Sequence, residues 1–276
     1  MTDEGVIGFY DRHPMSEWQI LQSLAKQGKR PPDLVPEDLF EFDQDHYGGV
    51  EAVVALAERA DIGPESVVLD LCSGLGGPAR LLAHRYGCQV TGVDITRSRV
   101  EGAQRLTEYV GLGDRVRFLE ADATSLPLPD AAFTACISQE AFVHIADKSA
   151  LFAGCLRILR GGGILAFTDW SAAGGLSEGE WRRLRAAFAA DGLVTTDYYC
   201  RALESAGFSD VSDEDLSLEW VPILQGRLEM YRDLREETVA RFGEERYNRY
   251  DHNYAFFVRL VETGKLGGVR LRAVRK

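Results

Sequence analysis

The stretch that most constrains the fold of this chain is residues 67–80, Val-Val-Leu-Asp-Leu-Cys-Ser-Gly-Leu-Gly-Gly-Pro-Ala-Arg. An apolar segment runs directly into Gly74, Gly76 and Gly77 and then into a helical pattern. Because glycine has no Cβ, the backbone can turn tightly and a ligand can lie against the main chain and the next helix N-terminus. Glycines also occur in turns that only reverse the chain. The motif alone therefore leaves a nucleotide site and a plain turn open.

A second apolar segment, Gln89–Asp94, ends in a carboxylate. Asp94 follows the glycines at about the distance at which a βαβ unit places a ribose-binding carboxylate. Two coupled signals are stronger than one, so together they favour nucleotide binding.

Apolar strands and amphipathic helices alternate after residue 66, which predicts a parallel sheet with crossover helices. We expect strands at 67–70, 89–93, 115–119, 132–137 and 164–168, and helices at 77–86, 98–110 and 148–159, the last one ended by Gly161–Gly163. A helix at 196–206, a strand near 208–217 and a terminal strand from residue 268 follow, and they bring the sheet to seven strands.

The regions on either side of this alternation are expected to be helical. Residues 1–40 form the predicted N-terminal helical cap, and residues 41–276 form one domain with lid segments near 171–195 and 218–264. The polar segment 42–49, which includes Tyr47, is predicted to close over a ligand, although an ordinary helix-entry loop has the same composition.

Composition excludes several classes of function. The chain has 43 acidic and 31 basic side chains, a net charge of −12, which opposes binding to nucleic acid or to anionic membranes. An acidic N-terminus and the absence of any long apolar run predict a cytoplasmic protein with no membrane segment. Five cysteines without CxxC pairing and five scattered histidines predict neither a disulfide nor a metal site.

Polar residues follow four of the predicted strands: Asp70, Asp94, Asp122 and the segment Ser138–Glu140. Ligands of open parallel sheets bind outside the carboxyl ends of the strands. Each residue alone could be a helix cap or a turn residue. Four in succession favour a binding site.

Residues 45–170 resemble a class I S-adenosylmethionine-dependent methyltransferase. The resemblance is carried by Asp70–Gly77, Gly92–Asp94, Glu120–Ala123, Leu126–Asp130, Ser138–Ala141 and Arg157–Gly163. It implies a Rossmann-like, seven-stranded, mostly parallel α/β sheet with helices on both faces and a helical lid in the C-terminal half.

The resemblance also implies S-adenosyl-L-methionine as cofactor. The glycines would lie along its methionine part, Asp94 would accept both ribose hydroxyls, and Asp122 with the N–H of Ala123 would bind adenine. The implied cofactor-binding set is Tyr47, Asp70, Ser73, Gly74, Gly76, Gly77, Asp94, Ile95, Asp122, Ala123, Ser138 and Gln139. The chain departs from the family pattern at Cys72 and Gly161, where glycine and proline are usual.

Within the family, residues 138–148 are most similar to sarcosine, dimethylglycine and phosphoethanolamine-type N-methyltransferases. The expected reaction is therefore methylation of a small-molecule amine. Carbon or oxygen methylation of a prenyl diphosphate, phenol or other metabolite is the alternative. A cofactor-binding module without activity and a nicotinamide-dependent oxidoreductase are less favoured, because the latter does not account for Asp122–Ala123.

An amine must be neutral to attack, so the reaction needs a base, and His144 is the candidate. A histidine that caps a short helix would look the same in the sequence. Aromatic residues of the lid could hold a methylated ammonium, or could simply pack. The sequence leaves the oligomeric state open, a homo-oligomer included.

Overall fold

A computed structural model of the protein describes residues 3–11, 13 and 15–276. Within these residues a seven-stranded sheet has the order β3-β2-β1-β4-β5-β7-β6. The strands are β1 (Val67–Leu71), β2 (Gln89–Asp94), β3 (Val116–Glu120), β4 (Phe133–Gln139), β5 (Leu159–Ala172), β6 (Phe208–Asp215) and β7 (Leu266–Arg275). The first five strands pair in parallel, and β7 is antiparallel to both β5 and β6. The predicted fold class is confirmed.

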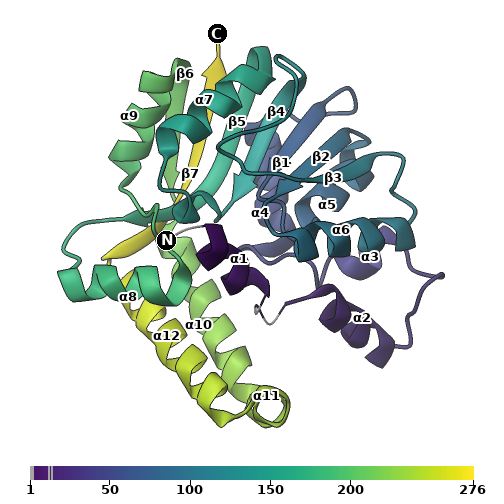
Figure 1. The fold of residues 1–276 in the computed structure, drawn as a ribbon, viewed down its shortest axis with the longest axis vertical. Coiled ribbons are helices and arrows are strands. Elements are labelled where there is room, and N and C mark those ends of the chain that lie inside the picture. The colour runs from purple at the N-terminus through teal and green to yellow at the C-terminus, as the bar shows by residue number, and fades with distance from the viewer. Residues whose placement is uncertain (1–2, 12, 14) are drawn as a thin grey trace.

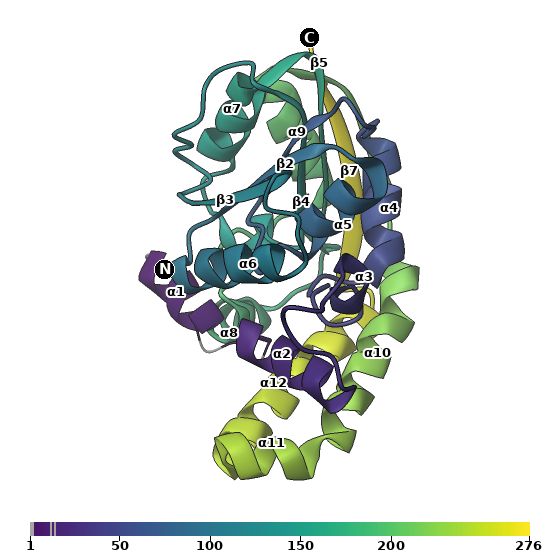
Figure 2. The ribbon, with the colours of Figure 1, turned by 90° about the vertical axis from the view of Figure 1, so that its right-hand side faces the viewer.

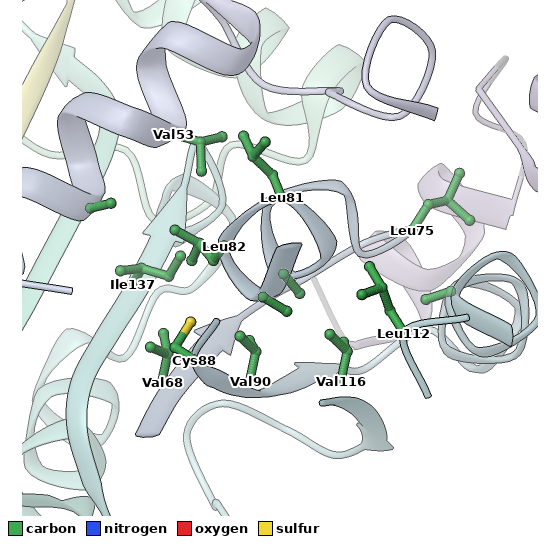
Figure 3. Packing of buried hydrophobic residues seen from close by; sticks show 14 of the residues in the cluster. Val53, Val68, Leu75, Leu81, Leu82, Cys88, Val90, Leu112, Val116 and Ile137 are labelled. Atoms are coloured by element: carbon green, nitrogen blue, oxygen red, sulfur yellow. The ribbon is translucent and has the colours of Figure 1, made fainter. Parts of the chain in front are cut away.

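Successive strand residues point to opposite faces of the sheet, and the two faces have different partners. Val68, Val90 and Ile137 pack with α4 (Gly49–Arg59), α5 (Gly77–Tyr86) and α6 (Arg97–Tyr109), as Figure 3 shows for Val53 and Leu81. Leu69 and its neighbours on the other face pack with α7 (Lys148–Ile158) and α9 (Thr196–Ala206). The sheet is thus buried on both sides, as its apolar strands require.

The remaining helices lie at one end of the sheet. They are α1 (Asp3–Asp11), α2 (Glu17–Lys26), α3 (Pro36–Leu39), the 3₁₀ turn η1 (Phe142–His144), α8 (Glu178–Phe188), α10 (Ser217–Asp233), α11 (Arg235–Phe242) and α12 (Glu244–Glu262). In Figure 1 β7 runs upward to the C-terminus, so the parallel strands run downward toward α1, α8, α10 and α12. Figure 2 shows the same helices at the lower end of the molecule. The carboxyl ends of the strands are therefore covered.

The predicted bounds of β5 are wrong at both ends, and the strand continues past residue 168 to Ala172. The sequence places a helix end and a glycine loop at residues 161–163, whereas β5 already begins at Leu159 and runs through these glycines. The pairing of Leu159 with Phe133 starts the strand early, and a register irregularity follows before the regular pairing from Ile164 onward. Glycine marks such irregularities because it tolerates unusual backbone angles, and Gly162 has a φ of 78°.

No helix in the described part of the chain combines the length and the apolar character needed to span a bilayer. The same residues contain no cluster of three or more His, Cys, Asp or Glu side chains suited to a metal ion.

A buried ion pair joins the N-terminal segment to the glycine turn. Arg80 on α5 is 0% exposed, and its guanidinium donates to Asp43 at 2.9 Å, to the carbonyl oxygen of Leu75 at 2.6 Å and to the hydroxyl of Thr107 at 3.1 Å. Burial raises the pKa of Asp43 even though Arg80 lies beside it. A guanidinium this deeply buried depends on each of these acceptors.

We predict that Asp43→Ala lowers the free energy of unfolding by about 3 to 5 kcal/mol, because it leaves the Arg80 cation buried and unpaired. Urea unfolding monitored by tryptophan fluorescence measures this change. The exposed pair Lys26–Glu237 is the control, and Glu237→Ala should cost less than about 1 kcal/mol. Equal, small effects of the two substitutions would show that the buried pair does not stabilise the fold.

Candidate active site

The turn after β1 is held to the end of β2 by two hydrogen bonds from backbone N–H groups. The N–H of Ser73 donates to the carbonyl oxygen of Val93 at 3.0 Å, and the N–H of Gly74 donates to Oδ2 of Asp94 at 2.9 Å. Oδ1 of Asp94 accepts the N–H of Thr96 at 2.8 Å. Asp94 therefore fixes the turn and the start of α6, and the second lone pair of each oxygen remains for a ligand.

The three positions of the motif require glycine for different structural reasons. A Cβ on Gly74 would meet no atom within 4 Å, so the space beside it is open. A Cβ on Gly76 would collide with the ring of Phe118, and one on Gly77 would collide with the backbone of Asp43. Gly76 and Gly77 thus allow close packing, whereas Gly74 borders the free space in which a ligand could lie.

Several buried polar atoms around this space lack a hydrogen-bond partner among the described residues. They are Oδ2 of Asp70, Oγ of Ser73, Oγ1 of Thr96, and both amide atoms of Gln139. They come from the ends of β1, β2 and β4, which are neighbours in the sheet. Buried polar atoms are normally paired, so such a group indicates a site that a polar ligand completes.

The carboxyl groups of Asp70 and Asp94 have pKa values above those of free carboxyl groups in solution. Burial raises the pKa of Asp70 to about 8, and the nearby Asp94 adds to the effect. Burial also raises the pKa of Asp94, although the N–H groups of Thr96 and Gly74 stabilise its anion. Asp70 is therefore largely protonated at neutral pH and can donate one hydrogen bond.

The other predicted site residues differ from one another in their contacts and burial. Ser138 is 1% exposed and donates its hydroxyl to the carbonyl oxygen of Leu71 at 2.8 Å, which joins β4 to β1. Asp122 accepts both the N–H and the hydroxyl of Thr124 at 2.8 Å. Ala123 is buried beside it, and Ile95 is half-buried after β2. These four residues lie at strand ends as expected, and their contacts to a cofactor stay a prediction.

Tyr47 belongs to the aromatic cluster of the helical segments. Its ring packs edge-on against Trp220, with centroids 4.8 Å apart, and the guanidinium of Arg227 lies 4.8 Å above it. Arg227 also donates to the carbonyl oxygens of Asp45 and His46. The segment after residue 42 is thus held against α10.

Glu140 is a site residue that the sequence indicated only as part of the strand end. Its Oε2 accepts the N–H of Tyr47 at 2.8 Å, and its Oε1 accepts the hydroxyl of Thr168 at 2.6 Å. Burial raises the pKa of Glu140 to about 7, despite these two donors. The residue has a φ of 46°, in the left-handed region that favours glycine. Such strain is typical of functional positions.

His144 is bound at both ring nitrogens. Its Nδ1 lies 3.1 Å from the carbonyl oxygen of Ala189, and its Nε2 lies 2.9 Å from the hydroxyl of Tyr10 on α1. Burial lowers the pKa of His144 to about 4, so the ring is neutral at physiological pH. Nδ1 then donates to Ala189, and Nε2 accepts the hydroxyl proton of Tyr10. No sequence motif marked Tyr10, which approaches His144 only through the tertiary fold.

Asp45 is a further carboxylate, in the segment that precedes Tyr47. It lies 3.6 Å from Nδ1 of His13. Burial raises its pKa, but the cations of Arg99 and Arg227 and the neighbouring His13 together hold the pKa below its usual range. Burial raises the pKa values of Tyr10 and Tyr250, and the charge of Asp45 adds to this effect.

The aromatic residues of the C-terminal half lie in different environments. Tyr250 and Tyr254 are stacked 5.8 Å apart, and Trp170 is stacked on Phe257 at 4.2 Å, all in the cluster that contains Tyr47. Tyr198 on α9, in contrast, is 44% exposed. The rings of this cluster therefore pack against one another, whereas Tyr198 is exposed.

Comparison with known proteins agrees with this geometry. The model of a methyltransferase domain family matches residues 69–167, which run from β1 into β5 and include the glycine turn and Asp94. Residues 69–167 therefore belong to a methyltransferase domain.

Two curated relatives are N-methyltransferases. The chain is 29% identical over 208 residues to the sarcosine/dimethylglycine N-methyltransferase of Halorhodospira halochloris, an alignment that covers 74% of each protein. It is 31% identical over 198 residues to the glycine/sarcosine/dimethylglycine N-methyltransferase of Actinopolyspora halophila, with 72% of this methyltransferase aligned. The chain spans only 35% of that second relative.

A solved structure shows the same fold over almost the whole chain. Phosphoethanolamine N-methyltransferase 2 of Haemonchus contortus, in complex with phosphomonomethylethanolamine and S-adenosylhomocysteine, superposes with a TM-score of 0.79 at 21% identity. The alignment covers 97% of this methyltransferase and 59% of the nematode protein. The helical segments around the sheet are therefore part of the shared fold.

Proposed function

We propose that this methyltransferase transfers the methyl group of S-adenosyl-L-methionine to the nitrogen of a small amine. The named activities of the N-methyltransferase relatives support this proposal. Within the molecule, the observation that carries it is the carboxyl group of Glu140, which is held at the strand ends with a pKa near 7.

The residues around the glycine turn fit the cofactor. Asp94 would accept the ribose hydroxyls, and the unpartnered polar atoms of Asp70, Ser73, Thr96 and Gln139 offer hydrogen bonds to its other polar groups. Open space beside Gly74 lets a ligand approach the backbone. When bound, the sulfonium supplies an activated methyl group, so the protein contributes mainly positioning and exclusion of water.

Glu140 is suited to remove a proton from the acceptor. A small amine reaches the site protonated at neutral pH and must lose a proton before its nitrogen can attack. A carboxyl group with a pKa of about 7 can hold the ammonium and take this proton. The N–H of Tyr47 and the hydroxyl of Thr168 bind its two oxygens separately, so the orientation of the carboxyl group is fixed.

His144, the base expected from the sequence, fits a different role. Its low pKa and its two hydrogen bonds make it a weak proton acceptor at neutral pH. Its neutral ring orients the Tyr10 hydroxyl and holds α1 over the strand ends. In this proposal α1 forms part of the N-terminal cap, and α8 with α10 to α12 forms the lid that excludes water.

Further properties belong to the same proposal. A net charge of −12 supports a small-molecule acceptor and opposes a nucleic-acid partner. Five thiols without a disulfide in the described residues support a cytoplasmic location.

We predict that Asp94→Ala weakens S-adenosylmethionine binding at least tenfold, because charge-assisted hydrogen bonds of about 1.5 to 3 kcal/mol each are lost. Isothermal calorimetry on a variant shown to be folded by circular dichroism measures the affinity. Asp94→Asn keeps one acceptor oxygen. Its affinity for the cofactor should therefore lie between those of the wild type and Asp94→Ala. Unchanged affinity in folded Asp94→Ala would remove this residue from the cofactor site.

The pH dependence of turnover should follow Glu140. Its raised pKa means that the base form appears only above about pH 7, so turnover at saturating amine should rise with pH through that value. Glu140→Gln should lower kcat by about 100-fold or more and remove this pH limb, while the cofactor dissociation constant changes little. Glu108→Gln, on the exposed side of α6, is the matched control. An acid limb centred near pH 4 would instead indicate His144.

The acceptor itself is tested with labelled cofactor. Sarcosine, dimethylglycine, ethanolamine and phosphoethanolamine should include a substrate, and mass spectrometry should place the new methyl group on nitrogen. Prenyl diphosphates and phenols test carbon and oxygen methylation in the same screen. A product methylated on carbon or oxygen would overturn the amine assignment, and cofactor binding without turnover on any compound would favour a binding module.

A further inference from the structure

A buried lysine lies under the turn that carries His144. Lys148, the first residue of α7, is 1% exposed. Its Nζ donates to the carbonyl oxygens of Phe142 at 2.8 Å and Gly192 at 2.7 Å, and also to that of Ile145. An ammonium has three N–H donors, so all of them are used by the backbone. Phe142 begins η1 and Ile145 follows it, whereas Gly192 belongs to the segment after α8.

The charge of Lys148 is balanced within the protein. Burial lowers the pKa of Lys148 to about 8, so it is still mainly charged at neutral pH. Asp169, at 0% exposure, lies close enough to oppose this shift and accepts the hydroxyl of Tyr199 at 2.8 Å. The ring of Tyr199 lies 5.5 Å from the ammonium. Burying a charge without partners would cost free energy. The countercharge and the full set of acceptors therefore stabilise the ammonium in this position.

The segment at residues 189–192 contacts the same turn through its backbone. The N–H of Gly192 donates to the carbonyl oxygen of Val143 at 2.7 Å, and the carbonyl oxygen of Ala189 accepts Nδ1–H of His144. A Cβ on Gly192 would collide with the carbonyl oxygen of Ile145. The two segments are therefore in direct backbone contact, and Lys148 donates to both.

We infer that Lys148 is a positioning residue, which holds the His144 turn and the segment 189–192 together so that the imidazole is aimed at Tyr10. This inference rests on the proposed function, in which His144 holds α1 over the strand ends. Lys148 would therefore affect turnover through His144. Lys148 itself contacts only backbone oxygens. Its loss would leave His144 chemically intact but free to leave its hydrogen bond to Ala189 and its place below α1.

A merely structural lysine would stabilise the fold without acting through His144, and a double-mutant cycle separates the two roles. Lys148→Met keeps the length of the side chain and removes its donors. We expect it to lower kcat at least tenfold when His144 is present, and by less than twofold in the His144→Ala background. The cofactor dissociation constant should stay within twofold of the wild type in both backgrounds.

A spectroscopic readout tests the same inference without turnover. The Nδ1–H proton of His144 should give a slowly exchanging NMR signal, assigned by its loss in His144→Ala. We expect this signal to disappear in Lys148→Met and to persist in Lys265→Met, whose lysine pairs with Glu180 on α8. If Lys148→Met does not fold, Lys148→Gln replaces it, since the shorter amide keeps a polar group in the site but cannot supply the three N–H donors of the ammonium.

The outcomes distinguish the two hypotheses. Persistence of the His144 signal in the Lys148 variant, or an equal loss of kcat in both backgrounds, overturns the positioning role and leaves the proposed function intact. Failure of the wild-type protein to methylate any amine overturns the proposed function, and the NMR comparison still decides whether Lys148 positions His144.

Discussion

The hydrogen bond from the Gly74 N–H to Asp94 is the contact on which the organisation of the site depends. It joins the turn after β1 to the end of β2, so the free space beside Gly74 has a defined wall. Gly76 and Gly77 let the same turn approach Phe118 and Asp43 closely. Arg80 then binds the carbonyl oxygen of Leu75 within the turn. A cofactor site on this scaffold is preorganised by contacts that lie behind it.

The parts of the site that the sequence predicted are those set by local order along the chain. Asp70, Asp94, Asp122 and Gln139 follow apolar strands, and parallel strands bring their carboxyl ends to one edge of the sheet whatever the details of packing. The seven strands and the bounds of α5, α6, α7 and α9 were predictable from the local pattern of apolar residues. The start of β5 was not, because it depends on the pairing of Leu159 with a distant strand.

The contacts around His144 could not be predicted, because they join residues far apart in the sequence. Tyr10 is 134 positions from His144, and Gly192 is 44 positions from Lys148. Neither pair forms a motif, and a lysine at the start of a helix normally reads as a solvated residue. Only the tertiary structure shows that Lys148 is buried and that the His144 ring is neutral and bound on both sides.

Strained backbone angles occur both at the strand ends and at the residues that make these long-range contacts. Cys72, Glu140 and Ala189 have positive φ values of 57°, 46° and 52°, and none of them is glycine. Each such residue costs on the order of 1 to 3 kcal/mol, so the surrounding contacts must hold it in place. Cys72 turns the chain before the glycines, Glu140 turns its carboxyl group toward Tyr47 and Thr168, and Ala189 presents its oxygen to His144. The departure from glycine at Cys72 is therefore tolerated at an energetic cost, which the hydrogen bonds of the adjoining turn offset.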